Sequence, residues 1–272
     1  MAVRFDAYTA TTSSVKADQA IAWLFHPGDT MQEGRGFHTF GHRVSVKDDS
    51  GDEVGYVAYG GRQGDRIMVE VKGIRTPEVV ERLRASAEHR CTRVDSCVDF
   101  ERPGVFEELL GPVMEVKHAF KLYGPRDGDW EMPELGRTQY LGAPSSAIRA
   151  RLYEKGKQPQ LRHLCRDNLV RLEVQVRPQK DAKTAFSSLS ALDVWGASKW
   201  TRELAARVFE QHLDSHPPGT IRKDSKRDEA LRWMVKQYGS HLVSLAADLG
   251  GWDCVGLTLS EMIKDGRSKR RL

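Results

Sequence analysis

The sequence has few cysteines, and they form no pattern that binds zinc or builds a disulfide framework. Four are spread over 272 residues, at Cys91, Cys97, Cys165 and Cys254. There is no CxxC pair and no spacing typical of a zinc site. We therefore expect reduced thiols, buried or inert, in a protein of the reducing cytoplasm.

Long apolar runs are also missing. The first twelve residues, MAVRFDAYTATT, contain no apolar segment of the kind that directs secretion. No later stretch approaches the roughly 20 residues that a membrane-spanning helix needs. Internal repeats and low-complexity segments are absent as well. These absences predict a protein that does not associate with a membrane.

Charge is modest overall and uneven along the chain. The net charge is +4, with 39% hydrophobic and 29% charged residues, as in an ordinary folded protein with one large domain or a main domain and a smaller one. Between Arg137 and Lys183, however, eleven Lys or Arg stand against four Asp or Glu, which leaves the rest of the chain slightly acidic. This local excess of positive charge predicts a polyanionic partner.

The basic segment contains the most unusual strand pattern. Residues 137–157, RTQYLGAPSSAIRARLYEKGK, read as two strands joined by a turn at Gly-Ala-Pro-Ser-Ser. Alternation places Arg149, Arg151, Tyr153 and Lys155 on one face of the second strand. Cations lower the pKa of a phenol and attract phosphate, as a tyrosine that attacks a phosphodiester requires. The alternative is a solvated strand face with an ordinary amphipathic tyrosine.

Two further strands present acidic side chains. In RVDSCVDF, residues 93–100, Asp95 and Asp99 share a face, and in LVRLEVQVRP, residues 169–178, Glu173 lies opposite the valines and leucines. Carboxylates on one face repel unless they are solvated or bind a cation, so a solvent-facing strand and a metal site both remain open. If the three strands adjoin, their polar faces build one site. We predict an α+β fold, an antiparallel sheet with helices packed on one face.

The boundary between domains is predicted at HPPGT, residues 216–220, because prolines and glycine stop helices. Residues 1–213 would form the main, site-bearing domain and residues 221–263 a small C-terminal helical region. Residues 264–272 would be a basic tail. Two helices divided near Gly239 are expected in the C-terminal region, either as a helix-turn-helix or as a plain helical hairpin.

The three strand sequences, in this order, resemble the replication initiation factor family. That family comprises rolling-circle replication initiators of plasmids and filamentous phages and relaxases of conjugative elements. The resemblance extends from FDAYT to the helices near Phe209, and its most specific part is YLG followed by RLYEKG and then RLEVQ. It implies a nicking-joining domain that acts on DNA.

The resemblance also implies roles for residues. Tyr153 would be the nucleophile, and Asp95 and Glu173, with Asp99 as a less secure third ligand, would hold Mg²⁺ or Mn²⁺. Carboxylate oxygens suit both of these hard ions.

Arg151 and Lys155 would stabilise the transition state. The residue before this lysine is most often Asp or Asn in the family, and it is Glu154 here.

DNA is the expected partner, as an origin that presents a single-stranded or hairpin nick site. A homodimer is expected from the resemblance, and a host helicase and polymerase are further candidate partners. The residues predicted to contact DNA are Arg149, Lys157, Arg162, Arg171 and Arg177.

Two other functions stay open, besides initiation of rolling-circle replication. A conjugative relaxase would use the same chemistry, and a catalytically inactive DNA-binding regulator would keep only the fold. Retention of the tyrosine, lysine and carboxylates together favours an enzyme. The sequence lacks the His-hydrophobic-His metal motif of the other large nickase class, since His38 and His42 are separated by Thr-Phe-Gly.

Overall fold

The computed structural model describes residues 2–159, 161–164, 166–219 and 226–268. The chain divides into two compact units, Met1–Thr220 and Ile221–Leu272. The three strands of interest belong to the first unit.

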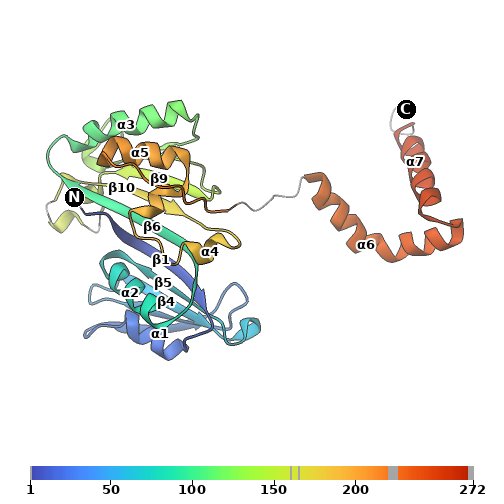
Figure 1. Cartoon of the computed structure of the whole chain (residues 1–272), viewed down its shortest axis with the longest axis horizontal. Coiled ribbons are helices and arrows are strands. Elements are labelled where there is room, and N and C mark those ends of the chain that lie inside the picture. Colours follow the sequence, from blue (N-terminus) through green and yellow to red (C-terminus); the bar gives the residue numbers. More distant parts are fainter. Residues whose placement is uncertain (1, 160, 165, 220–225, 269–272) are drawn as a thin grey trace. The chain divides into compact units, whose positions relative to one another are not determined.

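The described residues of the first unit form a ten-stranded sheet in which every neighbouring pair is antiparallel (Figure 1). In spatial order the strands are β2 (Thr30–Arg35), β3 (His42–Lys47), β4 (Glu53–Tyr59), β5 (Ile67–Lys72), β1 (Arg4–Thr12), β6 (Arg90–Glu101), β10 (Leu169–Val176), β9 (Ile148–Tyr153), β8 (Arg137–Leu141) and β7 (Arg126–Gly128). At the centre of the sheet, β6 lies between the first strand of the chain and β10, which comes from the second half of the chain.

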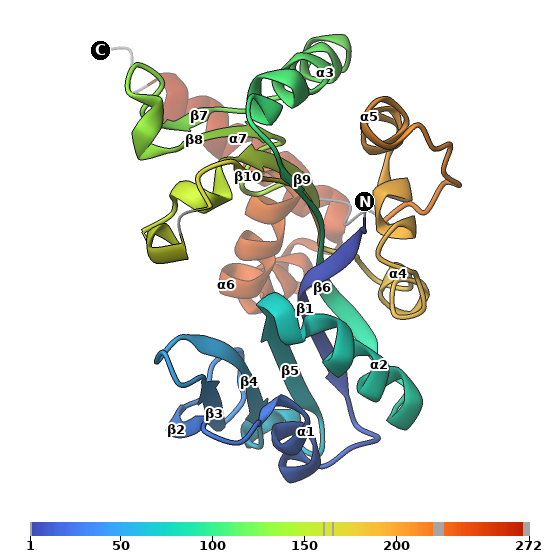
Figure 2. The same cartoon turned by 90° about the vertical axis from the view of Figure 1, so that its left-hand side faces the viewer.

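Helices cover one face of this sheet (Figure 2). They are α1 (Ala17–Leu24), α2 (Thr76–Ser86), α3 (Val105–Ala119), α4 (Ala182–Ala185) and α5 (Lys199–Phe209). One core cluster contains Val94 and Leu172 from the central strands together with Leu83, Val113 and Leu204 from the helices. The predicted α+β class, with helices on one face, is confirmed.

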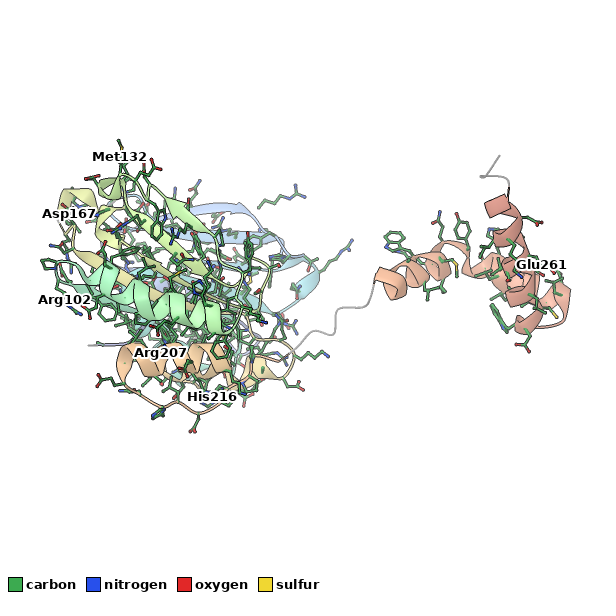
Figure 3. The ribbon with its side chains drawn as sticks, turned by 90° about the horizontal axis from the view of Figure 1, so that it is seen from above. Arg102, Met132, Asp167, Arg207, His216 and Glu261 are labelled. Atoms are coloured by element: carbon green, nitrogen blue, oxygen red, sulfur yellow. The ribbon has the colours of Figure 1, made fainter. Side chains whose placement is uncertain are left out.

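Local contacts hold α5 on the covered face. Ser198 and Thr201 form a capping box at its start, in which the Ser198 hydroxyl accepts a 3.2 Å hydrogen bond from the Thr201 backbone N–H. Arg207, labelled in Figure 3, lies near the end of α5. It pairs with Glu115 of α3 and, at 2.9 Å, with Glu203 of its own helix. Capping and ion pairing at opposite ends fix this helix beside α3.

A β-bulge in β1 changes which of its residues face the polar side. The pairing with β6 shifts between Phe5 and Ala7. Phe5 and Tyr8 both lie in the core, although residues three apart lie on opposite faces of a regular strand. The extra residue lets Arg4 and Asp6 both project from the opposite, polar face.

β8 and β9 form the predicted hairpin, with Gly142 in its turn at φ 88°. β9 ends at Tyr153, and Lys155–Lys157 form a short 3-10 turn, η4, where alternation predicted a continuing strand. In this turn a Cβ on Gly156 would lie 1.7 Å from the carbonyl oxygen of Arg166. Only glycine allows this close approach of the two backbones, so Gly156 helps to fix the position of the adjacent Lys155.

The second unit contains α6 (Lys226–Leu249) and α7 (Trp252–Ser268). The predicted break near Gly239 is wrong, because α6 continues through that residue. The helix ends instead at Gly250 and Gly251, whose φ angles of 82° and 153° favour glycine. The first part of the predicted basic tail belongs to α7, and residues 269–272 lie outside the described residues.

Among the described residues no single helix is long and apolar enough to cross a membrane. A bent pair of helical segments has the length and composition of a broken membrane span only when the two are taken together. The segments are Trp233–Leu249 and Trp252–Asp265, and the bend between them is 109°. Large apolar side chains are exposed on both helices, including Trp233, Tyr238, Val243, Trp252, Leu257 and Met262.

The cysteines follow the sequence prediction in part. Cys91 and Cys97 are buried free thiols, whereas Cys254 is free and exposed. Burial raises the pKa of the Cys97 thiol to about 12. Cys165 lies outside the described residues.

Candidate functional site

The sheet brings the three predicted strands together. β10 lies between β6 and β9, with Arg171 opposite both Tyr153 and Asp99, and Glu173 opposite Arg151. Their apolar sides face the helices, so their polar sides coincide, and the predicted adjacency of these strands is confirmed.

Tyr153 lies in the middle of this polar face, with only 5% of its surface exposed. Its hydroxyl donates to Oε2 of Glu173 over 3.4 Å, and the Arg151 guanidinium lies 4.9 Å from its ring centre. Burial and the Glu173 charge raise the pKa of the phenol well above its usual value, and Arg151 and Arg171 only partly oppose this. The sequence predicted the opposite shift, because alternation does not reveal how deeply the ring is buried.

Glu173 is held by Arg151. Arg151 Nη2 donates to both of its carboxylate oxygens, at 2.9 and 3.0 Å. Burial, together with the negative charges of Asp95 and Asp6, raises the pKa of Glu173 to about 7, despite the attraction of Arg151. Burial is therefore the main cause of this shift, and the contact with Arg151 opposes it.

Asp95 is the second carboxylate that the sequence predicted as a metal ligand together with Glu173. It accepts hydrogen bonds from Arg93 Nε at 2.9 Å and Nη2 at 2.5 Å, and from Gln175 Nε2 at 3.1 Å. In the β6–β10 ladder Gln175 pairs with Asp95, and Glu173 is two positions away. Such diagonal neighbours lie about 7–8 Å apart at their backbones, within reach of long side chains.

The donor set fits a hard divalent ion with two protein ligands. No group of three or more His, Cys, Asp or Glu side chains that could hold a metal occurs in the part of the chain that the structure describes. Asp95 and Glu173 nevertheless supply carboxylate oxygens, and Mg²⁺ is commonly held by one or two carboxylates plus substrate phosphate and water. The observation that favours a cation here is the placement of these two carboxylates on adjacent strands of one polar face.

Asp99 does not join this pair. Its carboxylate accepts from Arg171 Nε at 2.5 Å and Nη2 at 2.7 Å, and from Arg4 Nη2 at 3.0 Å. Arg171 also pairs with Asp6 at 2.5 Å. Burial alone would raise the pKa of Asp99, but the two arginines hold it below its usual value.

This ion-pair network corrects two expectations. Arg171 was predicted to contact DNA and Asp99 to bind metal, but they bind each other. Arg171 is 1% exposed, so its guanidinium lies beneath the surface rather than on it. Asp6 and Arg4, which sequence reasoning missed, complete the network because of the bulge in β1.

Replacing Arg171 by leucine should lower the free energy of unfolding by about 3–5 kcal/mol, because two half-buried carboxylates lose their buried partner. Urea denaturation followed by circular dichroism measures this. Arg166→Leu is the matched control, since the Arg166–Glu101 pair is 46% exposed on both sides and should contribute under about 1 kcal/mol. Equal losses in the two variants would contradict the structural role of Arg171.

Lys155 approaches the same network from η4. Burial lowers the pKa of its ammonium, as does the charge of Arg171, while Asp6 and Asp99 oppose the shift. Tyr153 therefore has Arg151 on the Glu173 side and Lys155 on the Asp99 side.

The remaining predicted DNA contacts lie around the hairpin. The Arg149 guanidinium stacks on the Tyr140 ring at 3.9 Å, and the Arg149 Nε atom is buried without a hydrogen-bond partner among the described residues. Arg177 donates to the Pro144 carbonyl at 3.0 Å. A pocket of about 40 Å³ opens between Arg149, Arg151 and Glu173.

Two other predicted contacts follow the hairpin. Lys157 pairs with Glu154 at 2.7 Å, and Glu154 also binds Arg137. The side chain of Arg162 lies outside the described residues.

Comparison with known proteins finds a similarity to a solved structure. No model of a known protein family matches the chain, and no curated protein matches it. Among solved structures, the chain is similar to the rolling circle replication initiator protein from Geobacillus stearothermophilus. The two are 21% identical, with a TM-score of 0.47, over 72% of this chain and 83% of the other.

Proposed function

We propose that this chain is a metal-dependent DNA strand nickase and strand transferase that initiates rolling-circle replication, with Tyr153 as its nucleophile. The observation that supports this most is the contact between the Tyr153 hydroxyl and Glu173, at 3.4 Å, next to a second carboxylate, Asp95. The ordered sequence motifs that resemble replication initiation factors support the same activity.

The reaction is a transesterification. The Tyr153 oxygen attacks a backbone phosphorus and forms a phosphotyrosine, and the bond from phosphorus to the 3′ oxygen breaks. The phenol proton passes to solvent, and the contact of the hydroxyl with Glu173 orients the Tyr153 oxygen beside the two carboxylates. The departing 3′ oxygen takes up a proton and becomes the free 3′-hydroxyl. Because one phosphoester replaces another, the reverse reaction rejoins the strand.

Two cations flank the nucleophile. The Arg151 guanidinium lies 4.9 Å from the Tyr153 ring centre. It pairs with Glu173 and can leave that carboxylate to bind a phosphate oxygen of the DNA. Lys155 has a lowered pKa, which makes it a better proton donor to the leaving oxygen. A Mg²⁺ or Mn²⁺ ion held by Asp95 and Glu173 would neutralise charge on the phosphate.

The partner in this proposal is origin DNA, with the nick site single-stranded or in a hairpin. A homodimer acting in the cytoplasm beside host helicase and polymerase belongs to the same proposal. A conjugative relaxase would use the same residues on a different origin.

A catalytically inactive DNA-binding regulator is the second candidate, and specific observations favour it. Tyr153 is buried with a raised pKa, and arginines already occupy Asp95 and Glu173. An active enzyme must open these contacts when DNA binds.

A cleavage assay separates the two candidates. Supercoiled DNA carrying the native flanks of the gene is incubated with the protein and Mn²⁺ or Mg²⁺, then treated with detergent and protease. An enzyme yields nicked circles that retain a peptide at the break, and EDTA prevents this. If the folded protein binds the DNA but produces no nick, the proposal that it is an enzyme is wrong.

A further inference from the structure

A groove of about 580 Å³ lies on the same polar face as the candidate site, over the other half of the sheet. Its lining includes five cationic side chains and one carboxylate. Arg93 connects the two regions, because it lines the groove and also binds Asp95. The groove is thus an extension of the site along β6 and β1.

Aromatic side chains form one wall of the groove. Phe37 is half-buried and meets Tyr56 edge to face, with ring centres 5.4 Å apart. Phe40 and Met68 complete this small apolar cluster, which is separate from the main core. An aromatic cluster on the uncovered face of a sheet is a surface on which a base can stack.

The loop that carries Phe37 is held in place. His38 and Thr39 have left-handed backbones, at φ 51° and 70°. Gln63 Nε2 donates to the His38 carbonyl at 3.1 Å and to the Thr39 hydroxyl at 2.7 Å. These contacts fix the strained loop, so Phe37 is presented before a ligand arrives.

Cations line the remainder of the groove. Arg66, Arg90 and Lys183 form no ion pair with a carboxylate among the described residues. The one carboxylate, Glu70, is occupied, because it accepts from Tyr56 at 3.0 Å and pairs with Lys72 at 3.1 Å. The groove therefore carries uncompensated positive charge beside aromatic rings.

We propose that this groove binds single-stranded DNA that flanks the cleaved bond, with phosphates on Arg66, Arg90 and Lys183 and a base on Phe37. Its place next to the nick rests on the proposed function, but the binding itself does not. Asp99 lies in the same cross-strand row as Tyr153, two strands away, and six residues of β6, about 20 Å of strand, separate it from Arg93. A strand that spans both sites must extend several nucleotides beyond the nick.

The test uses a fluorescent 16-nucleotide oligothymidine, which contains no nick site, with EDTA present. Fluorescence anisotropy gives the affinity at several salt concentrations. Arg66→Glu with Arg90→Glu should weaken binding at least tenfold and reduce the salt slope by about 1.4, since each single-strand phosphate contact contributes about 0.7. Phe37→Ala should weaken binding roughly five- to tenfold with little change in slope.

The matched control is Lys199→Glu, the same charge reversal at an exposed residue of α5 on the covered face. It should bind like the wild type. If the double variant does not fold, as judged by circular dichroism, Lys183→Glu replaces it. Equal weakening by Lys199→Glu, or no weakening by the groove variants, would overturn the proposal.

Two further outcomes are distinguished. If Phe37→Ala weakens binding to a 16-base-pair duplex as much as to the single strand, the groove is not a single-strand site. The proposed function fails separately, if Tyr153→Phe still cleaves DNA or if the wild type never does. Neither of these results changes the binding of oligothymidine.

Discussion

Tyr153→Phe should keep the fold and DNA affinity of the protein and lose cleavage by about 10⁴-fold or more, as expected when a nucleophile is removed. Only one oxygen is deleted, and among the described residues its hydrogen bond is the 3.4 Å contact to Glu173. Arg151 still satisfies that carboxylate, so the melting temperature should change little. The measurement is nicking of supercoiled DNA, followed over time by gel electrophoresis.

Tyr140→Phe is the control, and the structure makes it a demanding one. Tyr140 also has a cation beside it, because Arg149 of the adjacent strand stacks on its ring at 3.9 Å. We still expect the Tyr140→Phe variant to cleave DNA, because the hydroxyl that contacts Glu173 belongs to Tyr153. Mass spectrometry of the tryptic peptide joined to DNA decides the matter. An adduct on the Tyr140 peptide would refute the assignment.

Glu173→Gln and Asp95→Asn should each reduce affinity for Mn²⁺ by roughly 100-fold or more and abolish metal-dependent nicking. Isothermal titration gives the metal affinity, and anisotropy shows that DNA binding persists. The wild type should also bind Mn²⁺ more weakly at pH 6 than at pH 8. The pKa of Glu173 is raised to about 7, so below that value a proton competes with the metal.

Asp99→Asn is the comparison for these two variants. Because Arg171 and Arg4 already neutralise Asp99, this change should lower thermal stability and leave Mn²⁺ affinity near that of the wild type. If Asp99→Asn loses Mn²⁺ binding and the other two variants keep it, the metal binds at Asp99 and Asp6 instead of at Asp95 and Glu173.

Much of the sheet around the site could be predicted from sequence. Alternation in RVDSCVDF and LVRLEVQVRP identifies strands with one apolar face, and burial of that face against helices forces the polar sides together. This logic correctly brought Tyr153 near Glu173. It works because side-chain period and burial are local properties of each strand.

Other features depend on contacts that no single segment reveals. The bulge that turns Asp6 toward Arg171 is a one-residue irregularity without a sequence signature. Which arginine pairs with which carboxylate depends on strand register, so Arg171 was mistaken for a surface residue. The same is true of Arg149, whose stacking partner belongs to the neighbouring strand.

The pair between Asp6 and Arg171 joins positions 165 residues apart. A contact of such long range forms late, because closing a large loop costs entropy before any contact compensates for it. A nascent chain should therefore be unable to cut DNA until β10 has left the ribosome and docked beside β6. In refolding experiments, nicking activity should return with the slowest phase, well after most helical signal has been regained. Activity that recovered together with the helices would show that the centre assembles without this closure.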